Sequence, residues 1–187
     1  MRIRRLTAAA FAAVVLVSCD NPVRPVEAPG AEPPAATAFS YASSGDLSGY
    51  YMPAGEVQIG KWRLDHIFVG QAAEFRSWTG VDRNATFAPV MLQFDDPASP
   101  VVQTELGEAP SVTARVLPTR YAVSDDRIAF EGTSPEIGRV SFDGRLDQGA
   151  LATARRNLGD EGVVLTGTLT AGGQTVRGVR LRWWMGD

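Results

Sequence analysis

Apolar and polar residues alternate in short runs from Phe39 onward, which is the pattern of a β-rich chain. Turn-forming residues separate these runs at intervals of roughly ten positions, a spacing typical of an all-β sandwich or barrel. We expect one half-buried strand at 57–69, because successive residues in a strand point to opposite faces. The side chains predicted to share its apolar face are Trp62, Leu64, His66 and Phe68.

Further strands are expected toward the C-terminus, at 86–94, 111–117, 127–131 and 139–142. The clearest hairpin comes last, where two alternating arms at 162–170 and 174–185 flank an Ala-Gly-Gly turn. The second arm carries apolar residues on one face and arginines on the other. The apolar set is Val179, Leu181, Trp183 and Met185.

One helix is expected between the strands, at 148–158. Asp147 can accept backbone hydrogen bonds at its start, and Gly159 provides a left-handed stop at its end. Leucines and small residues recur at helical spacing between these two signals. The predicted fold is therefore all-β, an antiparallel β-barrel or β-sandwich with one short helix near residues 148–158.

The N-terminal segment has the pattern of a secretory signal. A basic start precedes an apolar run at 6–17 that only Thr7 interrupts. As a helix this run would span about 18 Å, well short of the roughly 30 Å hydrocarbon core of a membrane. We therefore expect a cleavable signal peptide at 1–18 rather than a stable membrane helix.

The signal ends in Leu16-Val17-Ser18-Cys19, which resembles the lipobox of bacterial lipoproteins at all four positions. The resemblance implies cleavage between Ser18 and Cys19, a diacylglycerol on the Cys19 thiol and acylation of the new amino group. Each buried methylene contributes about 0.8 kcal/mol, so several chains hold the protein at a membrane durably. The alternative, an ordinary signal cleaved after Ala12, would leave an apolar segment too short to function.

The lipobox resemblance implies a location in the bacterial cell envelope, lipid-anchored and facing the periplasm. Asp20 is similar to an inner-membrane retention signal of enteric-type bacteria, but other lineages read this position differently, so the choice of membrane stays open. The segment that follows contains five prolines and no aromatic residue, which predicts a tether rather than a packed core. The expected organisation is a signal peptide at 1–18, the lipidated cysteine with a Pro/Ala-rich tether at 19–38, and a single β-rich domain at 39–187.

Charge argues against a nucleic-acid partner. Three of the 18 basic residues leave with the signal peptide, so 15 remain against 21 acidic residues. The largest basic group is Arg177, Arg180 and Arg182 on one predicted strand, which we interpret as a solvated face. No basic stripe is present that would neutralise a run of phosphates.

Few residues suggest catalysis. His66 is the only histidine and no Gly-x-Ser-x-Gly motif is present, so a nucleophilic triad is not expected. Zinc prefers His and Cys ligands, of which the mature chain holds His66 and the predicted lipidated cysteine. Carboxylates are numerous, but most adjoin Gly, Pro or another Asp, where they usually cap turns. We expect no catalytic residue, no metal and no cofactor, and keep an envelope hydrolase as the third hypothesis.

Two short segments of the domain resemble known β-barrels. Gly60-Lys61-Trp62 looks like the Gly-x-Trp that opens the first strand of lipocalins, and 165–170 with 177–179 is similar to the last hairpin of the periplasmic polyisoprenoid-binding, lipocalin-like family. The resemblance implies a barrel around an apolar ligand. The candidate ligand-binding residues are Trp62, Leu64, His66, Phe68, Leu181 and Trp183. The alternative is that these residues fill a dry core.

Two functions follow as hypotheses. The first is a tethered, non-catalytic binding module for an apolar small molecule or an envelope polymer. The second is an assembly lipoprotein that binds another envelope protein. In that case the terminal strand, where Trp183 and Trp184 point to opposite faces, offers one ring to the partner.

Overall fold

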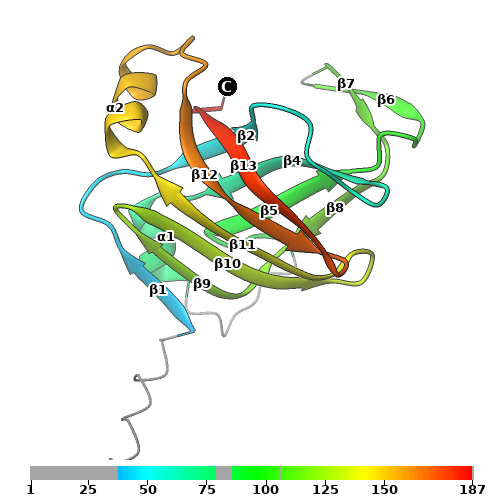
Figure 1. Ribbon diagram of the computed structural model, residues 1–187, viewed down its shortest axis with the longest axis horizontal. Helices are drawn as coiled ribbons and strands as arrows, with labels where there is room; N and C mark the ends of the chain where they lie inside the picture. The colour runs from blue at the N-terminus through cyan, green and yellow to red at the C-terminus, as the bar shows by residue number, and fades with distance from the viewer. Residues whose placement is uncertain (1–37, 79–85, 106, 187) are drawn as a thin grey trace, which may run out of the picture. The chain divides into compact units, whose positions relative to one another are not determined.

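The computed structural model describes residues 38–78, 86–105 and 107–186 (Figure 1). The predicted signal peptide, the lipobox with Ser18 and Cys19, and the tether as far as residue 37 lie outside the described residues. Within the described residues, no helix combines the length and the apolar character needed to span a bilayer.

The domain consists mainly of strands. The strands are β1 (Phe39–Ala42), β2 (Gly49–Pro53), β3 (Gln58–Ile59), β4 (Trp62–Val69), β5 (Val90–Asp95), β6 (Val101–Thr104), β7 (Gly107–Pro110), β8 (Thr113–Val116), β9 (Pro118–Ser124), β10 (Arg127–Ser134), β11 (Gly138–Leu146), β12 (Val163–Ala171) and β13 (Gln174–Trp184). The helices are α1 (Ala72–Ser77) and α2 (Gln148–Arg156).

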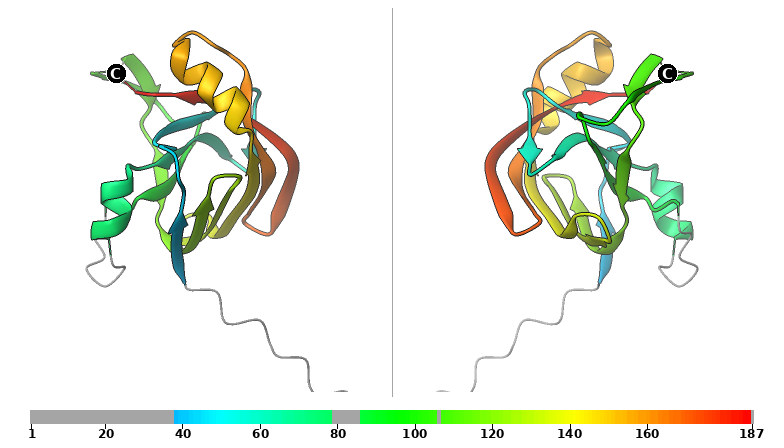
Figure 2. Two further views of the ribbon diagram at one scale, coloured as in Figure 1. Left: turned by 90° about the vertical axis from the view of Figure 1, so that its left-hand side faces the viewer. Right: turned by 90° about the vertical axis from the view of Figure 1, so that its right-hand side faces the viewer.

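One sheet of eleven strands forms the body of the described part of the chain. Its hydrogen-bonded order is β1-β9-β10-β11-β12-β13-β2-β4-β5-β8, with β3 paired to β4, while β6 and β7 form a separate hairpin. All pairs are antiparallel except β1 with β9, which run parallel. The sheet curls into a half-barrel (Figures 1 and 2). The prediction of an all-β, barrel-like fold is confirmed, and the arrangement is one curved sheet rather than two stacked ones.

The curl depends on a corner between β8 and β9. Only Leu117 separates these strands, yet β8 pairs with β5 at one end of the sheet and β9 pairs with β10 near the other. Gly132 of β10 faces this corner, where a Cβ atom would lie 2.4 Å from the Leu117 carbonyl oxygen. A side chain there would collide with backbone, so glycine permits the close approach that bends the sheet.

The prediction of one strand at 57–69 was wrong in two respects. The segment is a hairpin, because β3 turns at Gly60 and Lys61 and pairs antiparallel with β4. The second difference is a change of face within β4. In β4 the pairing with β5 skips Asp65, since Leu64 lies opposite Phe94 and His66 lies opposite Gln93. This extra residue is a β-bulge, and it reverses which side chains face inward. Trp62 and Leu64 are buried in the core, whereas His66 and Phe68 turn to the other face. Ile67 and Val69 take the inward positions after the bulge.

The predicted C-terminal hairpin is confirmed as β12 and β13. Gly172 and Gly173 both have positive φ angles, as a two-residue hairpin turn requires. Val179, Leu181 and Trp183 are buried on one face as expected. Met185 was expected with them, but β13 ends at Trp184 and the Met185 side chain is 56% exposed.

Helix α2 begins where the sequence predicted and ends two residues early. The Asp147 carboxylate accepts a hydrogen bond from the Ala150 N–H at 2.9 Å, which caps the first turn. The last helical residue is Arg156, and Asn157 follows in an extended conformation. The expected left-handed stop at Gly159 was therefore wrong.

Several elements were not predicted: β1, β2, β6, β7, β9 and α1. Most are short, and α1 has only six residues, too few for a helical repeat to stand out in the sequence. Its start is stabilised by the Glu74 carboxylate, which accepts a hydrogen bond from the Gln71 N–H at 2.6 Å. Two of these unpredicted strands and this helix carry the site described next.

Candidate functional site

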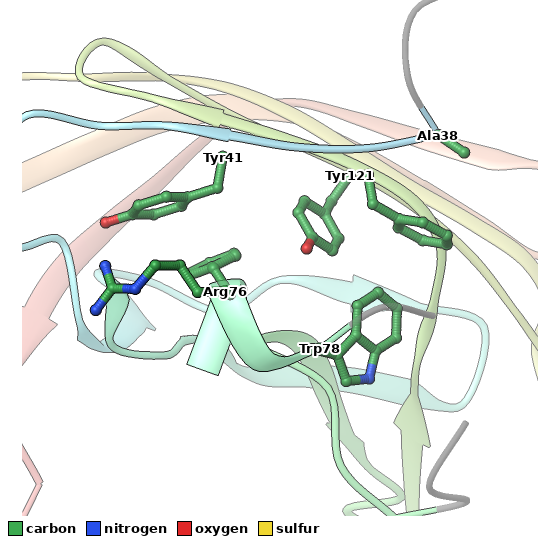
Figure 3. A pocket seen from close by; sticks show the side chains of 7 residues that line it. Ala38, Tyr41, Arg76, Trp78 and Tyr121 are labelled. Carbon is green, nitrogen blue, oxygen red and sulfur yellow. The ribbon is translucent and has the colours of Figure 1, made fainter. Parts of the chain in front are cut away.

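An aromatic cavity of about 460 Å³ lies between β1, β9 and α1 (Figure 3). Its volume falls within the range of small-molecule sites, roughly 300–1,000 Å³. Five of its seven lining residues are aromatic, and none is acidic. The lining residues are Ala38, Phe39, Tyr41, Phe75, Arg76, Trp78 and Tyr121.

The backbone of three separate segments brings these side chains together. Phe39 and Tyr41 are two residues apart on β1, so they point to the same face of that strand. The parallel pairing of β1 with β9 places Phe39 directly opposite Tyr121. On the other side of the cavity, α1 supplies Phe75 and the residue after the helix is Trp78.

The five rings form one connected network around the cavity. Tyr121 lies at its centre, with ring centroids 5.3 Å from Phe39, 5.5 Å from Phe75 and 5.7 Å from Trp78. Phe39 meets Trp78 edge to face at 4.8 Å, and Tyr41 stacks on Phe75 at 4.0 Å. These are favourable geometries for aromatic pairs. The contacts fix the ring positions and leave an apolar surface facing the cavity.

The polar groups of the cavity are unevenly placed. Figure 3 shows Arg76 beside Tyr41 at one end and Trp78 at the other, with the Tyr121 hydroxyl between them pointing toward α1. Tyr121 is only 3% exposed, and burial raises the pKa of its phenol. Within the described residues its hydroxyl has no hydrogen-bond partner. The buried Trp78 indole N–H has none either. The Tyr121 hydroxyl and the Trp78 indole N–H are therefore both available to bond to a ligand.

A carboxylate at the end of β9 holds β1 in place beside the cavity. Asp125 accepts hydrogen bonds of 2.8 Å from the hydroxyls of Ser43 and Ser44 and from the Ser44 N–H. Both serines follow directly after β1. The hydroxyl of Ser44, then that of Ser43, holds the pKa of Asp125 below its usual value.

The six ligand-binding candidates from the sequence lie elsewhere. Trp62, Leu64, Leu181 and Trp183 belong to the buried core cluster. His66 and Phe68 lie on the opposite face of β4, against the ring of Tyr50 at centroid distances of 5.0 and 5.4 Å. The structure therefore separates the six into two groups, and none of them lines the aromatic cavity.

The surroundings of His66 are polar on one side. Its Nδ1 lies 2.6 Å from the Asp65 carboxylate. Asp95 lies near, and burial, with the Asp65 charge as the second cause, raises the pKa of its carboxyl. Among the described residues, no three or more His, Cys, Asp or Glu side chains form a group that could hold a metal ion.

A second hollow lies at the C-terminal end of β13, with a volume of about 550 Å³. Its lining includes three exposed apolar side chains: Leu158, Trp184 and Met185. The neighbouring tryptophans differ as predicted, since Trp183 is buried and donates its indole N–H to the Ser48 carbonyl, whereas Trp184 is 40% exposed.

Comparisons of the chain with protein-family models, with curated proteins and with solved structures each found no match.

Sequence reasoning missed the aromatic cavity for a physical reason. Its rings come from 39–41, 75–78 and 121, and the parallel contact between β1 and β9 is what joins the first and last of these. A pairing between strands that are distant in sequence leaves no local pattern. The one usable signal was the density of aromatic residues at 39–51 directly after the proline-rich tether.

Proposed function

We propose that the protein is a lipid-anchored, non-catalytic binding module of a bacterial envelope, and that the aromatic cavity binds an apolar small molecule. The observation that carries the proposal is the ring network of Phe39, Tyr41, Phe75, Trp78 and Tyr121 around a volume of about 460 Å³. Rings that line a pocket of this size gain free energy from contact with an apolar ligand.

The position of the cavity in the chain supports the same proposal. Ala38, which lies at its rim, is the last residue of the predicted tether and the first residue that the structure describes (Figure 3). A lipid on Cys19 would hold this end of the domain within reach of a membrane, where apolar molecules are concentrated. The polymer ligand of the sequence hypothesis is less well matched, because a cavity of this volume accommodates a small molecule or the end of a chain.

Native mass spectrometry tests the proposal directly. The chain is exported with an ordinary cleavable signal in place of 1–18 and with Cys19→Ser, which removes the predicted acylation site, and it is purified without detergent. We expect an additional mass of a few hundred daltons that organic extraction removes. A clean apo mass under all purification conditions would contradict the proposal.

A pair of matched variants locates the ligand. Ala38→Trp places a ring at the rim of the cavity and is expected to reduce the bound mass strongly. Ala73→Trp adds the same ring at an exposed position on α1 that does not line the cavity, and is expected to keep the bound mass. Equal loss in both variants would place the ligand elsewhere.

The exposed side chains at the C-terminus favour a second candidate function, docking to another envelope protein. Trp184 and Met185 expose apolar surface beside a hollow, as docking sites commonly do. Deleting 183–187 would also remove the buried Trp183, so Trp184→Ser with Met185→Ser is the cleaner test. Chemical crosslinking of the anchored protein to other envelope proteins measures docking. Loss of the crosslinked complex in this variant would support docking if Val101→Ser with Val102→Ser, which removes exposed apolar side chains of β6, keeps the complex.

A further inference from the structure

The aromatic cavity has one cationic end. Arg76 is exposed at the side of the cavity where Tyr41 lies, while Trp78 closes the opposite side (Figure 3). Tyr41 has no hydrogen-bond partner for its hydroxyl in the part of the chain that the structure describes. An arginine and a phenol at one end of an apolar cavity form a pair of donors for an oxyanion.

Ion pairing separates Arg76 from half of the other twelve cationic side chains in the described residues. Five arginines each have a carboxylate within 4.0 Å: Arg63, Arg120, Arg127, Arg155 and Arg182. Within the described ranges Arg76 has none, and the cavity that it lines contains no Asp or Glu. Arg145, which also has no carboxylate partner in the described ranges, lies at an exposed position of β11 and does not line the aromatic cavity.

We propose that the cavity binds an anionic amphiphile, with its carboxylate or phosphate head at Arg76 and Tyr41 and its apolar body against Phe39 and Trp78. This inference rests on the proposed function of the same cavity and adds the class of ligand. The Tyr121 hydroxyl, which lies between the two ends and has no hydrogen-bond partner among the described residues, is placed to donate to an oxygen near the head group. An anion enters an apolar site only with such partners, because its desolvation is otherwise too costly.

A cationic ligand is the main competitor, because aromatic rings also attract quaternary ammonium groups. The guanidinium of Arg76 argues against it, since a like charge at the mouth opposes entry of a cation. A neutral ligand would form no charge-assisted hydrogen bond with Arg76. These three ligand classes are separated by three probes with the same ten-carbon chain: decanoate, decanol and decyltrimethylammonium.

The experiment measures the affinity of the full chain carrying Cys19→Ser for each probe by isothermal titration, near neutral pH where decanoate is ionised. We expect decanoate to bind at least about tenfold more tightly than decanol, the gain typical of a charge-assisted hydrogen bond. Arg76→Gln is expected to remove this difference while leaving the affinity for decanol within about twofold. Arg145→Gln, the matched control at an exposed position of β11, is expected to leave all three affinities unchanged.

Charge reversal at Arg76 predicts tighter binding of a cationic probe, which a misfolded variant would not show. Arg76→Glu is expected to weaken decanoate binding and to strengthen decyltrimethylammonium binding by about tenfold. Tyr41→Phe keeps the ring and removes the hydroxyl, and is expected to lower decanoate affinity by about two- to tenfold without changing that of decanol.

The outcomes distinguish this inference from the proposal on which it rests. Equal affinities for decanoate and decanol, unchanged by Arg76→Gln, would overturn the anionic head group and leave the cavity as an apolar site. Tightest binding of decyltrimethylammonium by the wild type would overturn it in favour of a cation. If none of the three probes bound at the highest concentration at which it stays dissolved as single molecules, the proposed function itself would fail, and the inference with it.

Discussion

Two aromatic regions of this domain show how the same residue types give a filled core in one place and a cavity in another. In the first region, β4 and β13 contribute Trp62, Leu64, Leu181 and Trp183, which are between 0 and 8% exposed. In the second, rings from β1, α1 and β9 surround a volume of about 460 Å³. Both regions contain tryptophan in contact with other large side chains, so composition does not separate them.

The difference lies in the backbone around each region. β13 pairs with β12 on one side and with β2 on the other, so its inward side chains are surrounded by neighbouring strands. β1 is the first strand of the sheet and pairs only with β9 in the described part of the chain. The six-residue α1 covers the rings of β1 from one side alone. A terminal strand beside a short helix leaves space that a central strand does not.

Lengthening the bulge in β4 should have the largest effect on this comparison. Insertion of one alanine after Asp65 would shift the residues after it by one position, turning His66 and Phe68 inward and Ile67 and Val69 outward. We expect the chain with the insertion to lose cooperative folding, observed as loss of near-UV circular dichroism and of a sigmoidal urea transition. Deletion of Asp65 is the control, because it leaves Leu64 and His66 opposite Phe94 and Gln93 and should keep the fold. A cooperatively folded insertion variant would show that the inward positions of Ile67 and Val69 do not fix the register.

The bulge also marks how far the sequence predicts the structure. Regular alternation predicted β4 and the last hairpin, and the Asp147 cap with helical spacing predicted α2, because each depends on neighbours in sequence. The bulge at Asp65 was not predictable, since it depends on pairing with Phe94 and Gln93. The cavity was missed for the same reason, because Phe39 and Tyr121 meet only through β1–β9 pairing.

In the core region, Trp183→Ala should be the next most costly change. The ring is buried, donates its indole N–H to the Ser48 carbonyl and stacks under the Arg155 guanidinium at 5.1 Å. Removal of a buried tryptophan typically costs about 3–5 kcal/mol of unfolding free energy. Urea denaturation measures it, and Trp184→Ala is the control, with an expected cost of about 1 kcal/mol or less because that ring is exposed. Equal losses of unfolding free energy in the two variants would mean that the Trp183 face and the Trp184 face of β13 do not differ in burial.

In the cavity region, Phe39→Ala should separate binding from stability. Phe39 is half-buried and contacts Trp78 and Tyr121, so we expect a loss of about 1–2 kcal/mol in unfolding free energy, less than for a core ring. Ligand binding should fall much more, because one wall of the cavity is gone. Denaturation and titration with decanoate measure the two effects. A large loss of stability with unchanged binding would make this ring part of the core.

The smallest effect is expected from Asp125→Asn, which weakens the attachment of β1 without touching a ring. The native pKa of Asp125 lies below its unfolded value of 3.8, so its contribution is present above pH 3.8 and is lost as the pH falls through the native pKa. The variant should therefore melt at a lower temperature than the wild type near neutral pH, and the difference should close as the pH falls below 3.8. Asp126→Asn is the matched control, because that carboxylate bonds to Ser124 within its own turn. A difference that persisted in acid would show that Asp125 stabilises β1 without its charge. If instead it closes together with a loss of binding of decanol, which does not titrate, in both proteins, the attachment of β1 and the shape of the cavity are one property.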